Sequence, residues 1–214
     1  MYIIDPTYFI KDISVPNSEE LNSGNADVLE MYIDKYARQL LKNALGYSLF
    51  NAFDSQVTDG VLNGGADQKW IDLVNGLEYT KDGIVYKWQG LKYEEGLYKN
   101  SLLAKYVFFH WYKENVTSLS GIGEVNLQAK NSITVEPNQR LVSVWNSFMY
   151  EYQWRQNNNK HNLNVFFKNG IPVYDFYNGD ENDYVSLLQF LTDKATDYPD
   201  APLKEYKLLN SFGI

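Results

Sequence analysis

The chain has 214 residues, 44% of them hydrophobic, which suffices for one domain with a buried core and a terminal extension. Cysteine is absent, and this excludes disulfides, thiolate metal sites and a cysteine nucleophile. The formal net charge is −8, with the acidic excess at the two ends. That distribution argues against a nucleic-acid-binding protein, which needs clustered Lys and Arg.

Residues 1–24 predict an extended arm, because Pro6 and Pro16 break any helix and polar loop formers follow. At most a short strand is expected near 8–13. The first helix is expected over 26–45, where apolar residues recur every three or four positions up to Gly46. A short helical turn at 48–54, a loop at 58–67 and a short helix from Trp70 to Gly76 should follow.

The middle of the chain begins with a predicted β-hairpin over 77–88, because the tight-turn pair Asp82-Gly83 joins two β-prone runs. A long helix is expected over 91–114, and its second half is apolar all round, as for a helix that is surrounded. Residues 118–136 read as a β-prone arm that lacks a partner strand within the chain. Pro137 then starts a helix over 137–158, since proline is tolerated at the first helical position.

In the tail, from residue 160 on, the sequence predicts a second hairpin, with strands at 165–167 and 171–177 around Asn169-Gly170. It also predicts a helix over 182–196. An apolar peptide, 204–214, ends the sequence. The apolar stripes predict a core that includes Leu40, Leu102, Tyr106, Phe109, Trp145 and Phe148.

The sequence contains no known catalytic constellation. His110 lies in the run FFHWY without a nucleophile and an orienting acid in any known pattern, so we expect a packed or interface histidine. Glu94 and Glu95 would diverge by roughly 100° on a helix and do not form a carboxylate pair. Two histidines and no cysteine argue against a transition-metal site. We therefore predict no catalytic, cofactor-binding or metal-binding residues.

The first residues, MYIIDPTYF, lack the basic and apolar regions of a secretory signal peptide, and no apolar run approaches the roughly 20 residues of a membrane span. We expect neither feature. Tyr is the commonest aromatic residue, 18 of them against 11 Phe and 5 Trp. Because Tyr suits surfaces that are half buried against a partner, this composition favours assembly.

Three stretches together resemble a known family. They are YARQLLKNALGYSLFNAF, then YKWQGLKYEEGLYKNSLLAKYVFFHWYKEN, then GIGEVNLQAKNSITVEP before the helix that begins near Asn138. The chain resembles the head–tail connector proteins (adaptors, or neck ring proteins) of tailed bacteriophages, including those of crAss-like and other Bacteroidetes phages. The similarity covers roughly 25–152.

The resemblance implies a mainly α fold, a helical-bundle adaptor core over 25–158 with a β-hairpin and an extended arm, preceded by an N-terminal arm (1–24) and followed by a C-terminal extension (159–214). It also implies a structural, non-enzymatic virion protein without cofactors. Such proteins form a ring in the phage neck, typically of twelve copies. The ring binds the portal protein and other neck or tail proteins, and it continues the channel through which DNA passes without specific binding.

Two segments are the candidate partner-binding surfaces. The arm contributes Ile122, Val125, Leu127, Ile133 and Val135, and the C-terminal peptide contributes Tyr206, Leu208, Leu209 and Phe212. The C-terminal peptide could equally fold back on its own domain. Two other functions stay open at this point: another neck or tail-completion protein, or a small-ligand-binding or enzymatic domain of an unrelated helical family.

Overall fold

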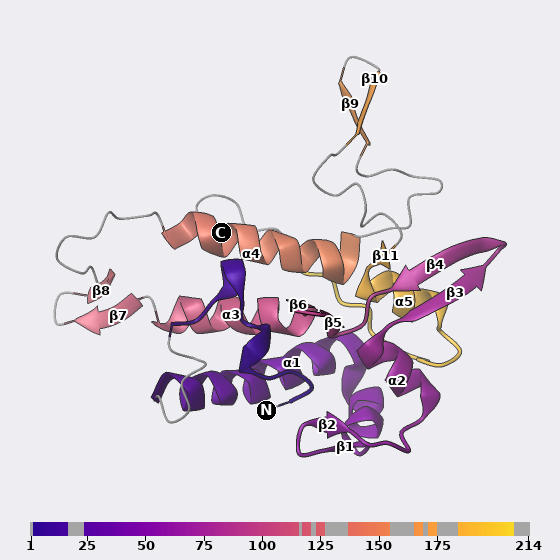
Figure 1. Ribbon diagram of the computed structural model, residues 1–214, viewed down its shortest axis with the longest axis horizontal. Helices are drawn as coiled ribbons and strands as arrows, with labels where there is room; N and C mark the ends of the chain where they lie inside the picture. Colours follow the sequence, from indigo (N-terminus) through magenta and orange to yellow (C-terminus); the bar gives the residue numbers. More distant parts are fainter. Residues whose placement is uncertain are drawn as a thin grey trace.

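The computed structural model describes residues 2–16, 24–115, 117–120, 123–126, 137–154, 165–168, 171–174 and 184–207 (Figure 1). The described helices are α1 (Gly24–Asp54), α2 (Gln68–Asn75), α3 (Leu102–Asn115), α4 (Pro137–Met149) and α5 (Leu187–Asp193). The shorter helical turns are η1 (Pro6–Tyr8), η2 (Lys11–Ile13) and the π-helical turn η3 (Tyr150–Trp154), which continues α4.

Small antiparallel hairpins surround these helices. The described strands are β1 (Val57–Thr58), β2 (Val61–Leu62), β3 (Leu77–Lys81), β4 (Ile84–Trp88), β5 (Tyr93–Glu95), β6 (Tyr98–Asn100), β7 (Thr117–Ser120), β8 (Gly123–Asn126), β9 (Val165–Lys168), β10 (Ile171–Tyr174) and β11 (Tyr184–Val185). Within the described residues they form four two-stranded ladders and one three-stranded sheet, β11-β4-β3. The fold is therefore mixed α/β, and the predicted mainly α helical bundle is wrong.

The predicted helix over 91–114 is wrong in its first part. Residues 93–100 form the hairpin β5–β6, which turns at Gly96, where φ is +59°. The helix begins only after Ser101, whose Oγ accepts a hydrogen bond from the backbone N–H of Ala104 at 3.3 Å. An N-terminal serine of this kind satisfies a backbone donor that the helix itself leaves unpaired.

The core lies where α3 runs between α1 and α4 (Figure 1). This position explains why α3 is buried from Leu102 to Phe109 except at Lys105: the helix packs against α1 on one side and α4 on the other. The predicted core residues are confirmed as buried: Leu40, Leu102, Tyr106, Phe109, Trp145 and Phe148.

Helix α1 confirms the predicted first helix and continues beyond it. Gly46 has φ +77° and ψ +170°, and the helix kinks there before it resumes as far as Asp54. The predicted short turn at 48–54 is thus the second half of α1. A Cβ on Gly46 would lie 3.2 Å from Cδ of Pro202, so the chain near the C-terminus rests against the kink.

The N-terminal segment is not an extended arm over the residues described. Residues 2–16 contain η1 and η2 instead of a strand at 8–13. Tyr2, Ile4, Tyr8 and Phe9 are buried. The segment crosses the domain, with η1 against α1 and β6 and η2 against α3 and α4.

The hairpin β3–β4 confirms the predicted Asp82-Gly83 turn, with both residues at positive φ. Strand β11 pairs in parallel with β4, placing Val185 opposite Trp88. The predicted helix over 182–196 therefore starts too early: α5 begins after Ser186, whose Oγ accepts from the N–H of Gln189. The predicted hairpin β9–β10 is confirmed, but the boundary at 158/159 lies outside the described residues.

Candidate interaction surface and polar networks

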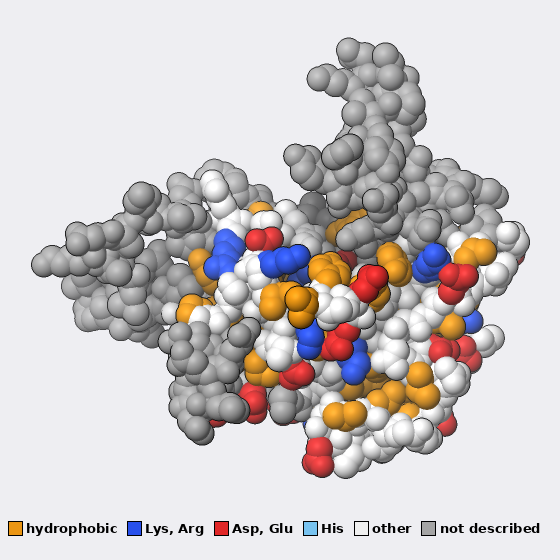
Figure 2. All heavy atoms as spheres, in the orientation of Figure 1, with side chains coloured by type: hydrophobic (Ala, Val, Ile, Leu, Met, Phe, Trp, Pro, Cys, Tyr) orange, Lys and Arg blue, Asp and Glu red, His pale blue; other side chains and the backbone are white. Residues whose placement is uncertain are grey.

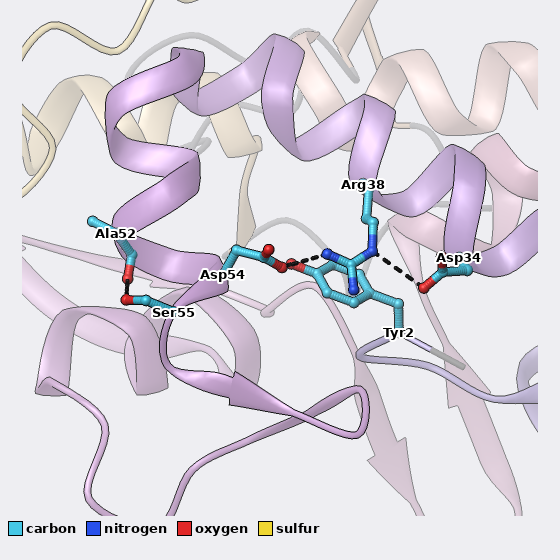
Figure 3. A network of polar contacts seen from close by, with 6 residues as sticks. All are labelled: Tyr2, Asp34, Arg38, Ala52, Asp54 and Ser55. Atoms are coloured by element: carbon cyan, nitrogen blue, oxygen red, sulfur yellow. Dashed lines mark hydrogen bonds and ion pairs between the residues drawn. The ribbon is translucent and has the colours of Figure 1, made fainter.

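Several buried or half-buried polar networks join segments that lie far apart in the sequence. The first lies beneath the kinked helix α1 (Figure 3). Arg38 donates from Nη1 to Asp54 at 2.5 Å and from Nε to Asp34 at 3.1 Å, and its guanidinium lies 4.0 Å from the ring centre of Tyr2. The Tyr2 hydroxyl donates to Asp54 at 2.8 Å. The network ties the N-terminal segment to both halves of α1.

This network is suited to structure and not to proton transfer. Burial and the hydrogen bond to Asp54 raise the pKa of the Tyr2 hydroxyl well above its ordinary value. The hydroxyl therefore stays a neutral donor, and Arg38 compensates the charge of the carboxylates around it.

The second network joins α1 to the end of α3. The hydroxyls of Tyr36 and Tyr32 both donate to the carboxylate of Glu114, and these bonds lower the pKa of that carboxyl. His110 stacks on the Tyr36 ring at 4.1 Å between ring centres, and burial lowers the pKa of its imidazole to about 4. The expected packed histidine is confirmed, because His110 is a neutral ring in an aromatic stack.

The third network is an ion pair below the surface. Lys105 on α3 lies 2.6 Å from Glu151 on η3, with side chains only 15% and 11% exposed. Asn100 on β6 donates to the same carboxylate at 3.0 Å. A buried pair of this kind is costly to break, because the remaining charge would stay in the interior without a partner.

The fourth network fixes α5 to the β3–β4 hairpin. The Asp193 carboxylate, 1% exposed, accepts from the Tyr79 hydroxyl at 2.7 Å, from Lys81 at 2.6 Å and from Gln189 at 2.8 Å. All these donors are protein groups. Asp193 is therefore a satisfied structural carboxylate and not an available acid or base.

The predicted arm has an intrachain strand partner after all. Strands β7 and β8 pair with each other, with Ser120 opposite Gly123 and Ser118 opposite Val125. The expectation that the arm finds no strand within its own chain is wrong at this point. Of the predicted arm residues, only Val125 is described; those outside the described residues are Ile122, Leu127, Ile133 and Val135.

The described part of the C-terminal peptide folds back on its own domain. The Tyr206 ring packs against Tyr152, Phe148 and Trp145, with centres 5.0, 5.5 and 5.7 Å apart. Trp145 Nε1 donates to the Lys207 carbonyl at 2.9 Å. Tyr206 is thus partly buried against the core of this chain, while Leu208, Leu209 and Phe212 lie outside the described residues.

Sequence reasoning found none of the four networks. Asp34 and Arg38 are spaced i, i+4, which is a recognisable helical pair. Gln189 and Asp193 have the same spacing. The remaining partners carry no local signal, since Tyr36 and Glu114 are 78 residues apart and Tyr79 and Asp193 are 114 apart. Their pairing depends on the tertiary fold.

Across the described residues, no helix combines the length and the apolar character needed to cross a bilayer. In the same part of the chain, no three His, Cys, Asp or Glu side chains are arranged to hold a metal ion. Comparison with known protein families, with curated proteins and with solved structures gives no match to this chain.

Proposed function

We propose that this chain is a structural, non-enzymatic virion protein of a tailed bacteriophage, a head–tail connector subunit that forms a ring in the neck. The observation that carries the proposal is the long insertion 116–136 between two helices that pack against each other in the core, α3 and α4. Connections longer than about 12–15 residues are uncommon in compact domains and are usually functional or disordered.

The hairpin inside this insertion supports assembly. Among the described strands, β7 and β8 pair only with each other, and β9 and β10 do the same. A two-stranded hairpin alone is marginally stable in water, and a further strand or a packed helix stabilises it. A neighbouring subunit can supply either one, by adding a strand to the hairpin edge or by covering its face.

The charge of the chain agrees with a channel-forming role. A net charge of −8 gives a surface that repels the phosphate backbone, so DNA can pass through the ring without being held. In this proposal the ring, typically of twelve copies, sits between the portal protein and the next neck or tail component.

The proposal is tested by electron microscopy of assembled particles that carry a labelled copy of the chain. We expect the label at the neck, in a ring below the portal. Label in the capsid wall, or no incorporation into particles, would contradict the proposal.

The role of the insertion is tested by deleting residues 122–134 and measuring the particle mass of the full-length and deleted proteins with isolated portal rings. We expect the deleted protein to keep its melting temperature, because α3 and α4 remain, and to lose ring formation. If both folding and ring assembly survive the deletion, the insertion is not the assembly element.

A further inference from the structure

A hollow on the surface lies where the N-terminal segment, β6 and α4 meet, away from the β7–β8 insertion. It consists of two adjoining pockets that share Lys11, Asp12, Ser143 and Val144. The smaller pocket holds about 210 Å³ and reaches Tyr98 and Lys105, and the larger holds about 490 Å³ and reaches Arg140. We call the two together the η2–α4 hollow. Figure 2 shows basic, acidic and hydrophobic side chains close together near the centre of the face that it draws.

The charge of the hollow is opposite to that of the chain. Its described lining holds four basic side chains, Lys11, Lys99, Lys105 and Arg140, and one acidic side chain, Asp12. The whole chain, by contrast, has a net charge of −8.

Two of these cations have no carboxylate partner among the described residues. Lys105 and Lys99 form ion pairs with Glu151 and Glu94. Arg140 donates instead to neutral backbone carbonyls, those of Asp12 at 2.7 Å and Ser14 at 3.2 Å. Lys11 forms no ion pair with any described residue, and its Nζ lies 5.0 Å from the ring centre of Tyr98. Both Lys11 and Arg140 line the larger pocket, which therefore favours an anionic group there.

The shape of the hollow fits an extended segment better than a compact ion. Its α4 lining runs from Gln139 to Ser147, which at 1.5 Å per helical residue is about 12 Å. An extended peptide of about four residues covers that length at roughly 3.3 Å per residue.

The walls offer both kinds of contact that a peptide needs. Ile10, Ile13 and Val144 give the smaller pocket an apolar side. The exposed side chains of Gln139, Ser143 and Ser147 have no hydrogen-bond partner within the described part of the chain, so they are available to main-chain N–H and C=O groups.

We propose that the η2–α4 hollow binds a short acidic peptide segment of a partner protein. One apolar side chain of that segment occupies the smaller pocket, and a carboxylate lies in the larger pocket by Lys11 and Arg140. This binding requires only the folded chain, and it is independent of ring formation and of the portal.

The test is selection of a random heptapeptide library on the full-length protein, followed by fluorescence polarisation with the best peptide. We expect enrichment of sequences in which Asp or Glu flanks a large apolar residue. Lys11→Glu should weaken binding at least tenfold, because it reverses the charge of a cation that lines both pockets. Lys42→Glu is the matched control, since Lys42 is an exposed lysine outside the hollow, and it should leave the affinity unchanged.

A second variant, Ser143→Trp, tests the site without changing its charge. Ser143 is exposed and lines both pockets, so a neutral bulky side chain there should block the peptide while the melting temperature stays that of the wild type. Three results would overturn the proposal: no acidic enrichment, equal weakening by Lys42→Glu, or full displacement of the peptide by millimolar citrate or phosphate. The last result would make the hollow a site for small anions.

Discussion

At the scale of single residues, two glycines let neighbouring chain segments cross with their backbones in contact. Gly76 and Gly90 have φ values of +95° and +96°. A Cβ on Gly90 would lie 2.6 Å from the Val74 carbonyl oxygen, and one on Gly76 would lie 2.6 Å from the Trp88 carbonyl oxygen. Only glycine fits these positions, because the backbone atoms it faces cannot rotate away.

We expect Gly90→Ala to lower the free energy of unfolding by at least about 2 kcal/mol, since it adds a steric clash to an unfavourable φ. Urea denaturation measures the change. Gly64→Ala is the control, because nothing lies within 4 Å of the added methyl group, and it should be near neutral. Equal changes in unfolding free energy for the two substitutions would show that the segments around Gly76 and Gly90 pack less closely than described.

His110 makes stability depend on pH. Its folded-state pKa, about 4, lies below the ordinary histidine value of 6.5. Between these values the unfolded chain binds more protons than the folded one, so stability is retained above about pH 6.5 and lost as the pH falls toward 4. We expect this group to cost on the order of 1–2 kcal/mol between pH 7 and pH 5.

The measurement compares thermal or urea unfolding of the wild type and of His110→Phe at both pH values. Phe keeps a ring beside Tyr36 and removes the titrating group. The variant should lose less stability on acidification than the wild type. Parallel pH profiles for the two proteins would show that another group governs the acid response.

At the scale of elements, the sequence predicts those whose signals are local. The stripe of α1, the Asp82-Gly83 turn and the start of α4 at Pro137 are all encoded within a few neighbouring residues. The hairpin β5–β6 is not, because KYEEGLYKN also fits a helical spacing and Gly96 is the sole local sign of a turn. Asp59-Gly60, by contrast, is a favoured hairpin turn at positive φ that joins β1 to β2, and the predicted loop at 58–67 overlooked it.

Elements that depend on distant partners could not be predicted. Strand β11 forms against β4, where Tyr184 pairs with Lys87, and a two-residue strand has no periodicity of its own. The polar networks could not be predicted for the same reason, because most of their partners lie far apart in the sequence. Sequence reasoning predicted a packed or interface histidine at His110 from its apolar neighbours, but it could not find Tyr36 as its stacking partner on a different helix.

The C-terminal peptide, as an element, is expected to stabilise the isolated domain. Truncation after Pro202 removes Tyr206 and its contacts with Tyr152, Phe148 and Trp145. We expect truncation, and Tyr206→Ala alone, to cost about 2–4 kcal/mol in unfolding free energy. Tyr206→Phe should cost much less, because it keeps the ring and loses mainly the hydrogen bond from Asn43 at 3.1 Å.

A separate variant isolates the rest of the peptide. This variant combines the substitutions Leu208→Ser, Leu209→Ser and Phe212→Ser and leaves Tyr206 in place. If this triple variant keeps the wild-type melting temperature but no longer joins the neck ring that we propose, the three residues dock on a partner. If Tyr206→Ala leaves the melting temperature unchanged, the packing described for the peptide is not significant in solution.

At the scale of the whole molecule, the charge predicts how the protein meets DNA. With 19 basic and 27 acidic residues, the chain lacks the excess of cations that phosphate binding requires. We expect no retardation of duplex DNA by micromolar protein in a gel-shift assay at about 0.1 M salt. Micromolar binding that weakens with added salt would contradict the prediction and the proposed passage of DNA through a ring.

The core is completed by segments from opposite ends of this sequence. Tyr2 is buried against α1. Tyr206 packs on an aromatic site on α4, where Trp145 also donates a hydrogen bond to the Lys207 carbonyl. During synthesis α1, α3 and α4 emerge before Tyr206, so the aromatic site stays open until translation has passed that residue. We expect a copy that stops earlier to leave the Tyr206 side of Trp145 and Phe148 uncovered and to be degraded more readily than the longer chain. The stability of the domain therefore depends on synthesis continuing through Tyr206, because that residue supplies part of the aromatic packing.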